Sequence, residues 1–110
     1  KIEDIPILVV KRDSTRENFN KEKIVNGLII ACQKRPISRK QIEELAEDIE
    51  KSISNNMLTE VESRVIGEMV MDRLKNIDEV SYVRFASVYR EFKDITTFID
   101  EINVLRTEKK

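Results

Sequence analysis

Residues 7–23 read ILVVKRDSTRENFNKEK, and the stretch changes from apolar to basic at Lys11. Its first four residues are β-branched or leucine, which is the composition of a buried strand. The Asp-Ser-Thr sequence at residues 13–15 favours a turn, and residues 16–19 predict a second strand, so a β-hairpin is the simplest interpretation. Because an isolated hairpin is only marginally stable in water, it must pack on the rest of the chain.

The rest of the chain has the apolar spacing of amphipathic helices. We expect a first helix from Asn20, which is a good N-cap, to Arg35, which precedes Pro36. Ser38 and Gln41 fit a capping box at the start of a second helix, which ends at residues 54–56. Residues 57–62 are either a short third strand or a loop. Further helices are expected over residues 63–74, over residues 80–92 with Asp78 as the cap, and over residues 94–105 as a fifth helix or an extension of the fourth.

Length and composition are those of one globular domain. The chain has 110 residues, 37% of them charged and 40% hydrophobic, with a formal net charge of −1. Phosphate backbones attract a clear basic excess, so this balance does not indicate a DNA-binding domain. We expect an α+β, mostly helical domain over residues 7–105, with an arm over residues 1–6 and a charged tail over residues 106–110.

The cysteine and histidine counts exclude several kinds of site. Cys32 is the single cysteine, and there is no histidine. An intramolecular disulfide, a zinc site of Cys and His ligands and a Ser-His-Asp centre are therefore impossible within this chain. Cys32 is expected to fill core space. Its isolation fits the reducing cytoplasm, and no apolar run is long enough to span a membrane. We expect no signal peptide, and the start at Lys1 rather than Met suggests a fragment.

Three cations lie in the predicted hairpin and at the start of the helix that follows it. Lys11 and Arg12 follow the first strand, and Lys23 lies in the first turn of the first helix. Cations and the free N–H groups of a helix N-terminus together bind phosphate, and an anion would offset the unfavourable position of a cation there. The alternative is a solvated strand end with ordinary surface cations. Neighbours on a strand point to opposite faces, so Lys11 and Arg12 share a ligand only if the turn twists.

Two further features have both a structural and a functional interpretation. Glu17 either forms a cross-strand salt bridge, which contributes little when exposed, or accepts a hydrogen bond from a ribose hydroxyl or an adenine amino group. An aromatic stripe at helical spacing is helix core, a base-stacking platform or a partner surface, and tyrosine hydroxyl groups favour a boundary with water. The stripe consists of Tyr82, Phe85, Tyr89 and Phe92.

Several segments together carry a resemblance to a known family. They are residues 9–13 (VVKRD), 17–19 (ENF), 21–24 (KEKI) and 80–92 (VSYVRFASVYREF). The first three resemble the ATP-cone, a small nucleotide-binding domain found on ribonucleotide reductases and on NrdR-type repressors. The last segment, with residues 32–38 and 60–74, is more similar to the NrdR-type repressors than to a reductase cone.

The resemblance implies a fold, ligands and contact residues. The fold would be a small β-hairpin or sheet that caps a bundle of four to five helices, and the ligands would be ATP and dATP. The phosphates would lie near Lys11, Arg12 and Lys23. The family positions that line the nucleotide match Val9, Glu17, Phe19 and Asn20, with Tyr89 and Lys93 on the fourth helix as more distant matches.

The resemblance also implies a function, which is a nucleotide-sensing domain of a transcriptional repressor of ribonucleotide reductase genes. ATP and dATP would favour different self-associated assemblies by linkage, and a zinc ribbon absent from this chain would bind operator DNA. We expect no catalytic activity and no membrane contact. The alternatives are the allosteric ATP-cone of a ribonucleotide reductase and a helical interaction module without a ligand. Ser14 stands where the family often has glycine, so the turn is either different or modestly strained.

Overall fold

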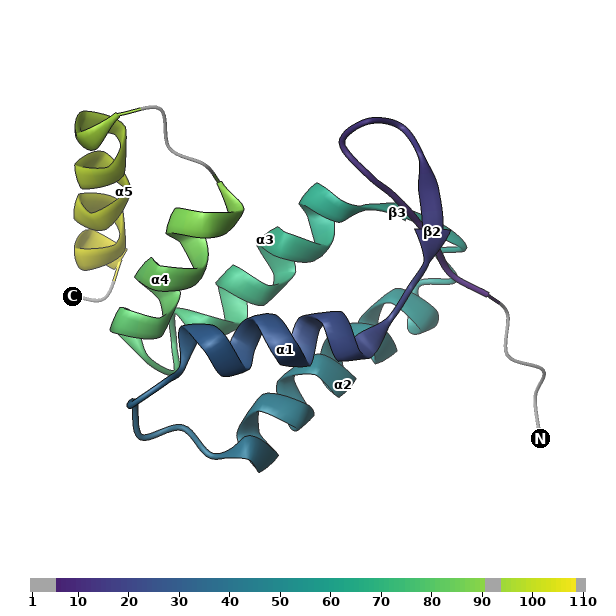
Figure 1. Cartoon of the computed structure of the whole chain (residues 1–110), viewed down its shortest axis with the longest axis horizontal. Coiled ribbons are helices and arrows are strands. Elements are labelled where there is room, and N and C mark those ends of the chain that lie inside the picture. The colour runs from purple at the N-terminus through teal and green to yellow at the C-terminus, as the bar shows by residue number, and fades with distance from the viewer. Residues whose placement is uncertain (1–5, 91–93, 109–110) are drawn as a thin grey trace.

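The computed structural model describes residues 6–90 and 94–108, and it has the predicted α+β, mostly helical architecture (Figure 1). A small sheet lies at one end of a helical bundle, and α5 stands at the other end. No helix within the described ranges has the length and apolar character needed to cross a membrane. The elements in chain order are β1 (Leu8–Val10), β2 (Arg16–Asn18), α1 (Lys21–Ala31), α2 (Arg39–Asn55), β3 (Glu60–Glu62), α3 (Ser63–Leu74), α4 (Glu79–Tyr89) and α5 (Ile95–Glu108).

The predicted hairpin supplies two strands of a three-stranded sheet with the order β2-β1-β3, in which β1 is the central strand. Strand β1 pairs antiparallel with β2, where Val9 faces Glu17, and parallel with β3, where Val9 faces Val61. Residues 57–62, for which the sequence allows either a strand or a loop, contribute the strand β3. The prediction of a buried first strand holds at Val9, which is buried, but is wrong at Leu8, which is 36% exposed. Alternate residues of a strand point to opposite faces, and the helices cover only one face of this sheet.

The hairpin turn keeps a left-handed residue although it lacks glycine. Ser14 has a φ of 72°, and its N–H donates to the Lys11 carbonyl at 2.9 Å. The Asp13 carboxylate accepts hydrogen bonds from the backbone N–H and the hydroxyl group of Thr15, at 3.0 and 2.6 Å. These two bonds lower the pKa of Asp13. The turn geometry therefore remains at the cost of the modest strain that a Cβ atom brings in this region.

The core lies between the first four helices. Helix α1 packs on α2 and α4, and α3 packs on the same two helices. Cys32 is buried in this core, as predicted. The largest side chains that are almost completely buried belong to Leu28, Ile49, Ile53, Met71, Leu74, Val25 and Val70.

The three predicted helix caps are confirmed. Asn20 accepts a hydrogen bond from the Glu22 N–H at 2.9 Å. Ser38 and Gln41 form the reciprocal capping box, and Asp78 accepts from the N–H at the start of α4. Each cap depends only on residues within one turn, which is why sequence spacing was sufficient to locate it.

Two helix ends differ from the prediction. Helix α1 stops at Ala31 instead of Arg35, and Lys34 has a left-handed φ of 62°. At this end the Arg84 guanidinium donates to the Ala31 and Gln33 carbonyls, at 3.2 and 2.7 Å. Carbonyls at a helix end need such partners, and this one comes from α4. Helix α5 runs to Glu108, so residues 106–108 of the predicted charged tail continue that helix.

An ion pair fixes the α1–α2 connection to the start of α4. The Arg35 guanidinium donates through Nε and Nη2 to the two carboxylate oxygens of Asp78, at 2.9 and 2.8 Å. Asp78 also accepts from the Ser81 hydroxyl at 2.9 Å. The Arg35 bonds, together with those from Ser81, hold the pKa of Asp78 well below its usual range. The cap is therefore a carboxylate at neutral pH and stabilises the helix dipole.

Substituting alanine at two helical glycines should change the free energy of unfolding in opposite directions. A Cβ atom at Gly67 in α3 would lie 2.1 Å from two ring carbons of Tyr89, so that ring would have to move. A Cβ atom at Gly27 in α1 would lie 3.7 Å from a ring carbon of Phe85, which is an ordinary contact. We expect Gly67→Ala to lower the free energy of unfolding by about 1–3 kcal/mol through overpacking. Gly27→Ala should raise it by up to about 1 kcal/mol, because alanine favours the helix.

Urea unfolding followed by circular dichroism measures both changes. The matched control is Gly67→Ala in a Tyr89→Ala background, where the clash is gone and the added cost should disappear. If Gly27→Ala lowered the free energy of unfolding as much as Gly67→Ala does, the close packing of the Tyr89 ring on α3 would be contradicted.

Candidate functional site

Three charged side chains from the hairpin and from α1 gather at one place. Lys23, in the first turn of α1, donates from Nζ to both carboxylate oxygens of Glu17 on β2, each at 2.9 Å. Lys11 Nζ, just after β1, lies 4.0 Å from Glu17 Oε1. The hydrogen bond from Lys23 and the charges of Lys23 and Lys11 lower the pKa of Glu17. Glu17 is therefore ionised at neutral pH and lies between two exposed ammonium groups.

Arg12 is bonded to the end of α4. Its guanidinium Nη2 donates to the backbone carbonyl of Tyr89 at 2.6 Å. That carbonyl belongs to the last turn of α4, where carbonyl groups have no partner within the helix. Arg12 and Lys11 therefore face different partners, as expected for neighbours at the end of a strand, and the hairpin turn is bonded directly to α4.

The other predicted residues of the hairpin region have identifiable structural roles. Val9 is buried in the core cluster, and Phe19 is half-buried against it. The backbone N–H of Phe19 donates to the Ile7 carbonyl at 2.8 Å, which extends the hairpin pairing beyond Asn18. The Asn20 side-chain oxygen is occupied by its cap bond. Of the predicted set, Lys93 lies outside the described residues.

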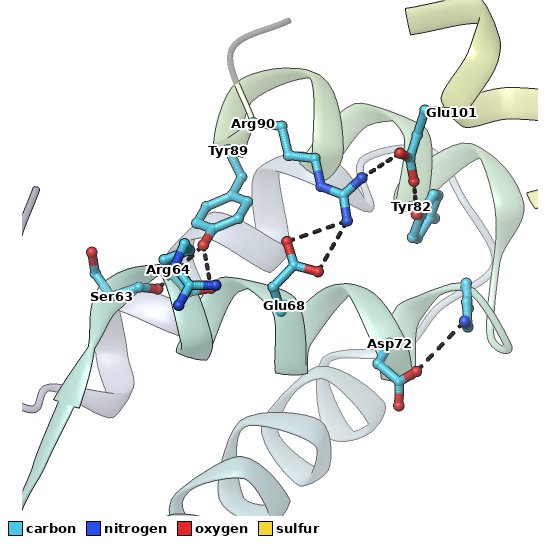
Figure 2. Close-up of polar contacts among 9 residues, drawn as sticks. Ser63, Arg64, Glu68, Asp72, Tyr82, Tyr89, Arg90 and Glu101 are labelled. Atoms are coloured by element: carbon cyan, nitrogen blue, oxygen red, sulfur yellow. Dashed lines mark hydrogen bonds and ion pairs between the residues drawn. The ribbon is translucent and has the colours of Figure 1, made fainter. Parts of the chain in front are cut away.

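Tyr89 is held against two helices. Its ring stacks on Phe85, with centroids 6.0 Å apart and planes inclined by 19°. Figure 2 shows its hydroxyl group directed at the start of α3, where it donates to the Arg64 carbonyl. Burial and the nearby charge of Glu68 raise the pKa of Tyr89, so the hydroxyl keeps its proton at neutral pH. With Tyr82 buried, the described part of the aromatic stripe packs as helix core, and Phe92 lies outside the described residues.

A second polar cluster, which the sequence reasoning missed, joins α3, α4 and α5 (Figure 2). Arg90 donates to Glu68 of α3, at 2.9 and 3.2 Å, and to Glu101 of α5. The Tyr82 hydroxyl donates to the other oxygen of Glu101 at 2.5 Å. No local spacing pattern predicts such contacts, because the partners belong to separate helices.

A cavity of about 270 Å³ lies at this second cluster. Three of its lining residues are carboxylates, and Arg90, one of its two cations, is already paired with two of them, which disfavours a polyphosphate there. The full lining comprises Glu68, Met71, Asp72, Lys75, Tyr82, Arg90, Glu101 and Val104.

The chemistry available at the hairpin is ion binding. Exposed ammonium groups and a helix N-terminus can bind an anion by charge-assisted hydrogen bonds. Across residues 6–90 and 94–108, no three or more carboxylate, cysteine or histidine side chains are arranged to hold a metal ion.

Comparison with known proteins agrees with these features. Residues 7–95 match the family model of the ATP cone domain. The chain is 78% identical over 107 residues to a protein of Clostridium beijerinckii named transcriptional repressor NrdR, covering 97% of this chain and 72% of that protein. A protein of the same name from Clostridium botulinum is 74% identical, with 96% and 70% covered. One from Clostridium acetobutylicum is 66% identical, with 99% and 72% covered.

These relatives are named as repressors and not as enzymes. The high identity extends over the hairpin, the helices and the loops between them, so the likeness is not confined to one motif. The chain therefore belongs to the NrdR family of transcriptional repressors, in which residues 7–95 form the ATP-cone domain.

Proposed function

We propose that this chain is the nucleotide-sensing domain of a transcriptional repressor, and that it binds ATP and dATP at the hairpin and the start of α1. The observation that carries the proposal is the gathering of Lys11 and Lys23 around Glu17 within an ATP-cone domain. Both ammonium groups are exposed, with 48% and 62% of the side chain accessible. A phosphate group can therefore reach them without any rearrangement of the core.

Each predicted residue has a place in this proposal. Lys11, Arg12 and Lys23 bind the phosphates, and Val9 and Phe19 form the apolar support beneath them. Asn20 fixes the start of α1, whose N–H groups face the ligand. Tyr89 approaches from the end of α4, and Lys93, which lies outside the described residues, is a further contact that the family resemblance implies. Glu17, which accepts both hydrogen bonds from Lys23, is exchanged for phosphate oxygens when the nucleotide binds.

ATP and dATP differ by the ribose 2′-OH, so a sensor must have a group whose hydrogen bonding depends on that hydroxyl. The two ligands then shift the assembly only as far as their affinities for its states differ. We propose that the chain self-associates differently with each nucleotide. A zinc ribbon outside these 110 residues would bind the operator of ribonucleotide reductase genes in the cytoplasm, so any zinc belongs to that ribbon.

Removing both hairpin cations tests the phosphate site. Lys11→Ala/Arg12→Ala should weaken ATP and dATP by at least about tenfold, because a hydrogen bond to a charged group contributes about 1.5–3 kcal/mol. Isothermal titration calorimetry on this chain measures the change. The matched control is Arg39→Ala/Lys40→Ala, which removes the same two charges from exposed positions at the start of α2 and should bind normally.

Unaltered affinity in the Lys11→Ala/Arg12→Ala variant would move the phosphates elsewhere. If the unaltered chain bound neither nucleotide at micromolar concentrations, the sensing function itself would be wrong. The helical interaction module would then be the better interpretation.

Glu17→Gln separates two roles of that carboxylate. If Glu17 only pairs with Lys11 and Lys23, its loss frees them for phosphate, and both nucleotides should bind up to about fivefold more tightly, the range of an exposed ion pair. Calorimetry with ATP and dATP gives the ratio of affinities. A selective loss of ATP binding would instead identify Glu17 as the group that bonds the 2′-OH.

The assembly proposal predicts that the size of the particle depends on the nucleotide. We expect sedimentation velocity to give different distributions for the chain alone, with ATP and with dATP, because each ligand stabilises the state that binds it better. The Lys11→Ala/Arg12→Ala variant should show no such response at the same concentrations. Identical distributions under all three conditions would count against nucleotide-controlled association.

A further inference from the structure

Two adjacent residues at the end of α4, Tyr89 and Arg90, bond to different parts of the molecule. On one side, Arg12 of the hairpin turn donates to the Tyr89 carbonyl at 2.6 Å. On the other side, the Arg90 side chain donates to Glu68 of α3 and to Glu101 of α5. The carbonyl that binds Arg12 of the candidate nucleotide site and the side chain that binds α5 thus belong to adjacent residues.

Glu101 connects α5 to both ends of α4. One of its carboxylate oxygens accepts from Arg90, near the end of α4, and the other accepts from the Tyr82 hydroxyl, near its start (Figure 2). The Glu101 side chain is only 19% exposed. By contrast, Ile99 and Val104 on the same helix are 47% and 53% exposed. Among the α5 side chains that the structure describes, Glu101 therefore supplies the polar contacts that join this helix to α4.

We propose that the Arg12–Tyr89 bond couples nucleotide binding to the docking of α5, with the two events opposing each other. This proposal rests on the nucleotide site described above. A phosphate that binds the Arg12 guanidinium displaces the Tyr89 carbonyl from it, because a guanidinium bonds an anionic oxygen more strongly than an uncharged one. The released carbonyl loses a partner at a helix end, so the last turn of α4 loosens and Arg90 no longer holds Glu101 in place.

Thermodynamic linkage gives the sign of an observable effect. If nucleotide binding weakens α5 docking by a given factor, then loss of α5 docking must strengthen nucleotide binding, by at most that same factor. Glu101 is thus a positioning residue for a ligand that it does not touch. Loss of its bonds should tighten ATP binding, whereas loss of an ordinary structural contact would leave binding unchanged or weaken it.

Three variants test this linkage by calorimetry with ATP. Glu101→Gln should tighten binding about threefold to tenfold, near the lower end of typical couplings between sites. Tyr82→Phe removes one bond to Glu101 without changing charge and should tighten binding by a smaller factor. Asp100→Asn, on the same helix at an exposed position, removes the same charge as Glu101→Gln and should leave the affinity within twofold.

Amide hydrogen exchange of residues 95–108 provides a second readout. Exchange in α5 should become faster when ATP binds, and also in the ligand-free Arg12→Ala variant. Lys11→Ala is the matched control without ligand, since Lys11 faces Glu17 and its loss should leave exchange in α5 unchanged.

Unaltered ATP affinity in both Glu101→Gln and Tyr82→Phe would overturn the coupling, as would equal tightening by Asp100→Asn. Unchanged exchange in Arg12→Ala would overturn it independently of any ligand. If the unaltered chain does not bind ATP, the nucleotide function fails, and the Arg12→Ala exchange measurement still decides whether Arg12 controls α5.

Discussion

The parallel pairing of β1 with β3 is the constraint on which the site depends. Strands of three residues cannot hold a hairpin in place alone, and the register that sets Val9 opposite Val61 attaches it to the helical bundle. Both valines are buried, so their apolar contacts oppose any slip, which would turn every side chain to the other face. Because the hairpin is fixed, Lys11 and Arg12 occupy defined positions relative to α1 and α4.

The cations around the proposed site at that hairpin already have polar partners. Glu17 lies between two ammonium groups, and Arg12 is bonded to a helix carbonyl. A ligand anion therefore exchanges partners instead of meeting bare cations. Exposed ion pairs contribute little to stability, so the exchange at Glu17 costs little, while the exchange at Arg12 changes what holds α4. In the mechanism that we propose, the same ligand is thus bound at Lys11 and Lys23 and changes the contacts of α4 through Arg12.

Local features of the fold could be predicted closely because they depend on residues within one or two turns. The caps at Asn20, Ser38 and Asp78 follow from short-range hydrogen bonds, and the buried faces of the helices follow from the period of the apolar residues. Prediction failed where a distant residue intervened. Helix α1 ends at Ala31, where Arg84 of α4 donates to the Ala31 and Gln33 carbonyls, and no pattern near Ala31 predicts that partner.

The sequence by itself determined the family, the hairpin, the helix starts and the cations available to an anion. The tertiary structure alone decided which partner each charge has. Arg12 donates a hydrogen bond to Tyr89, which is 77 positions away in the sequence. Glu101 accepts hydrogen bonds from both Tyr82 and Arg90. Helical and strand periods fix side-chain directions only within one element, whereas contacts between elements depend on how the whole core packs. That packing brings the hairpin turn to the end of α4 and makes α5 part of the same network.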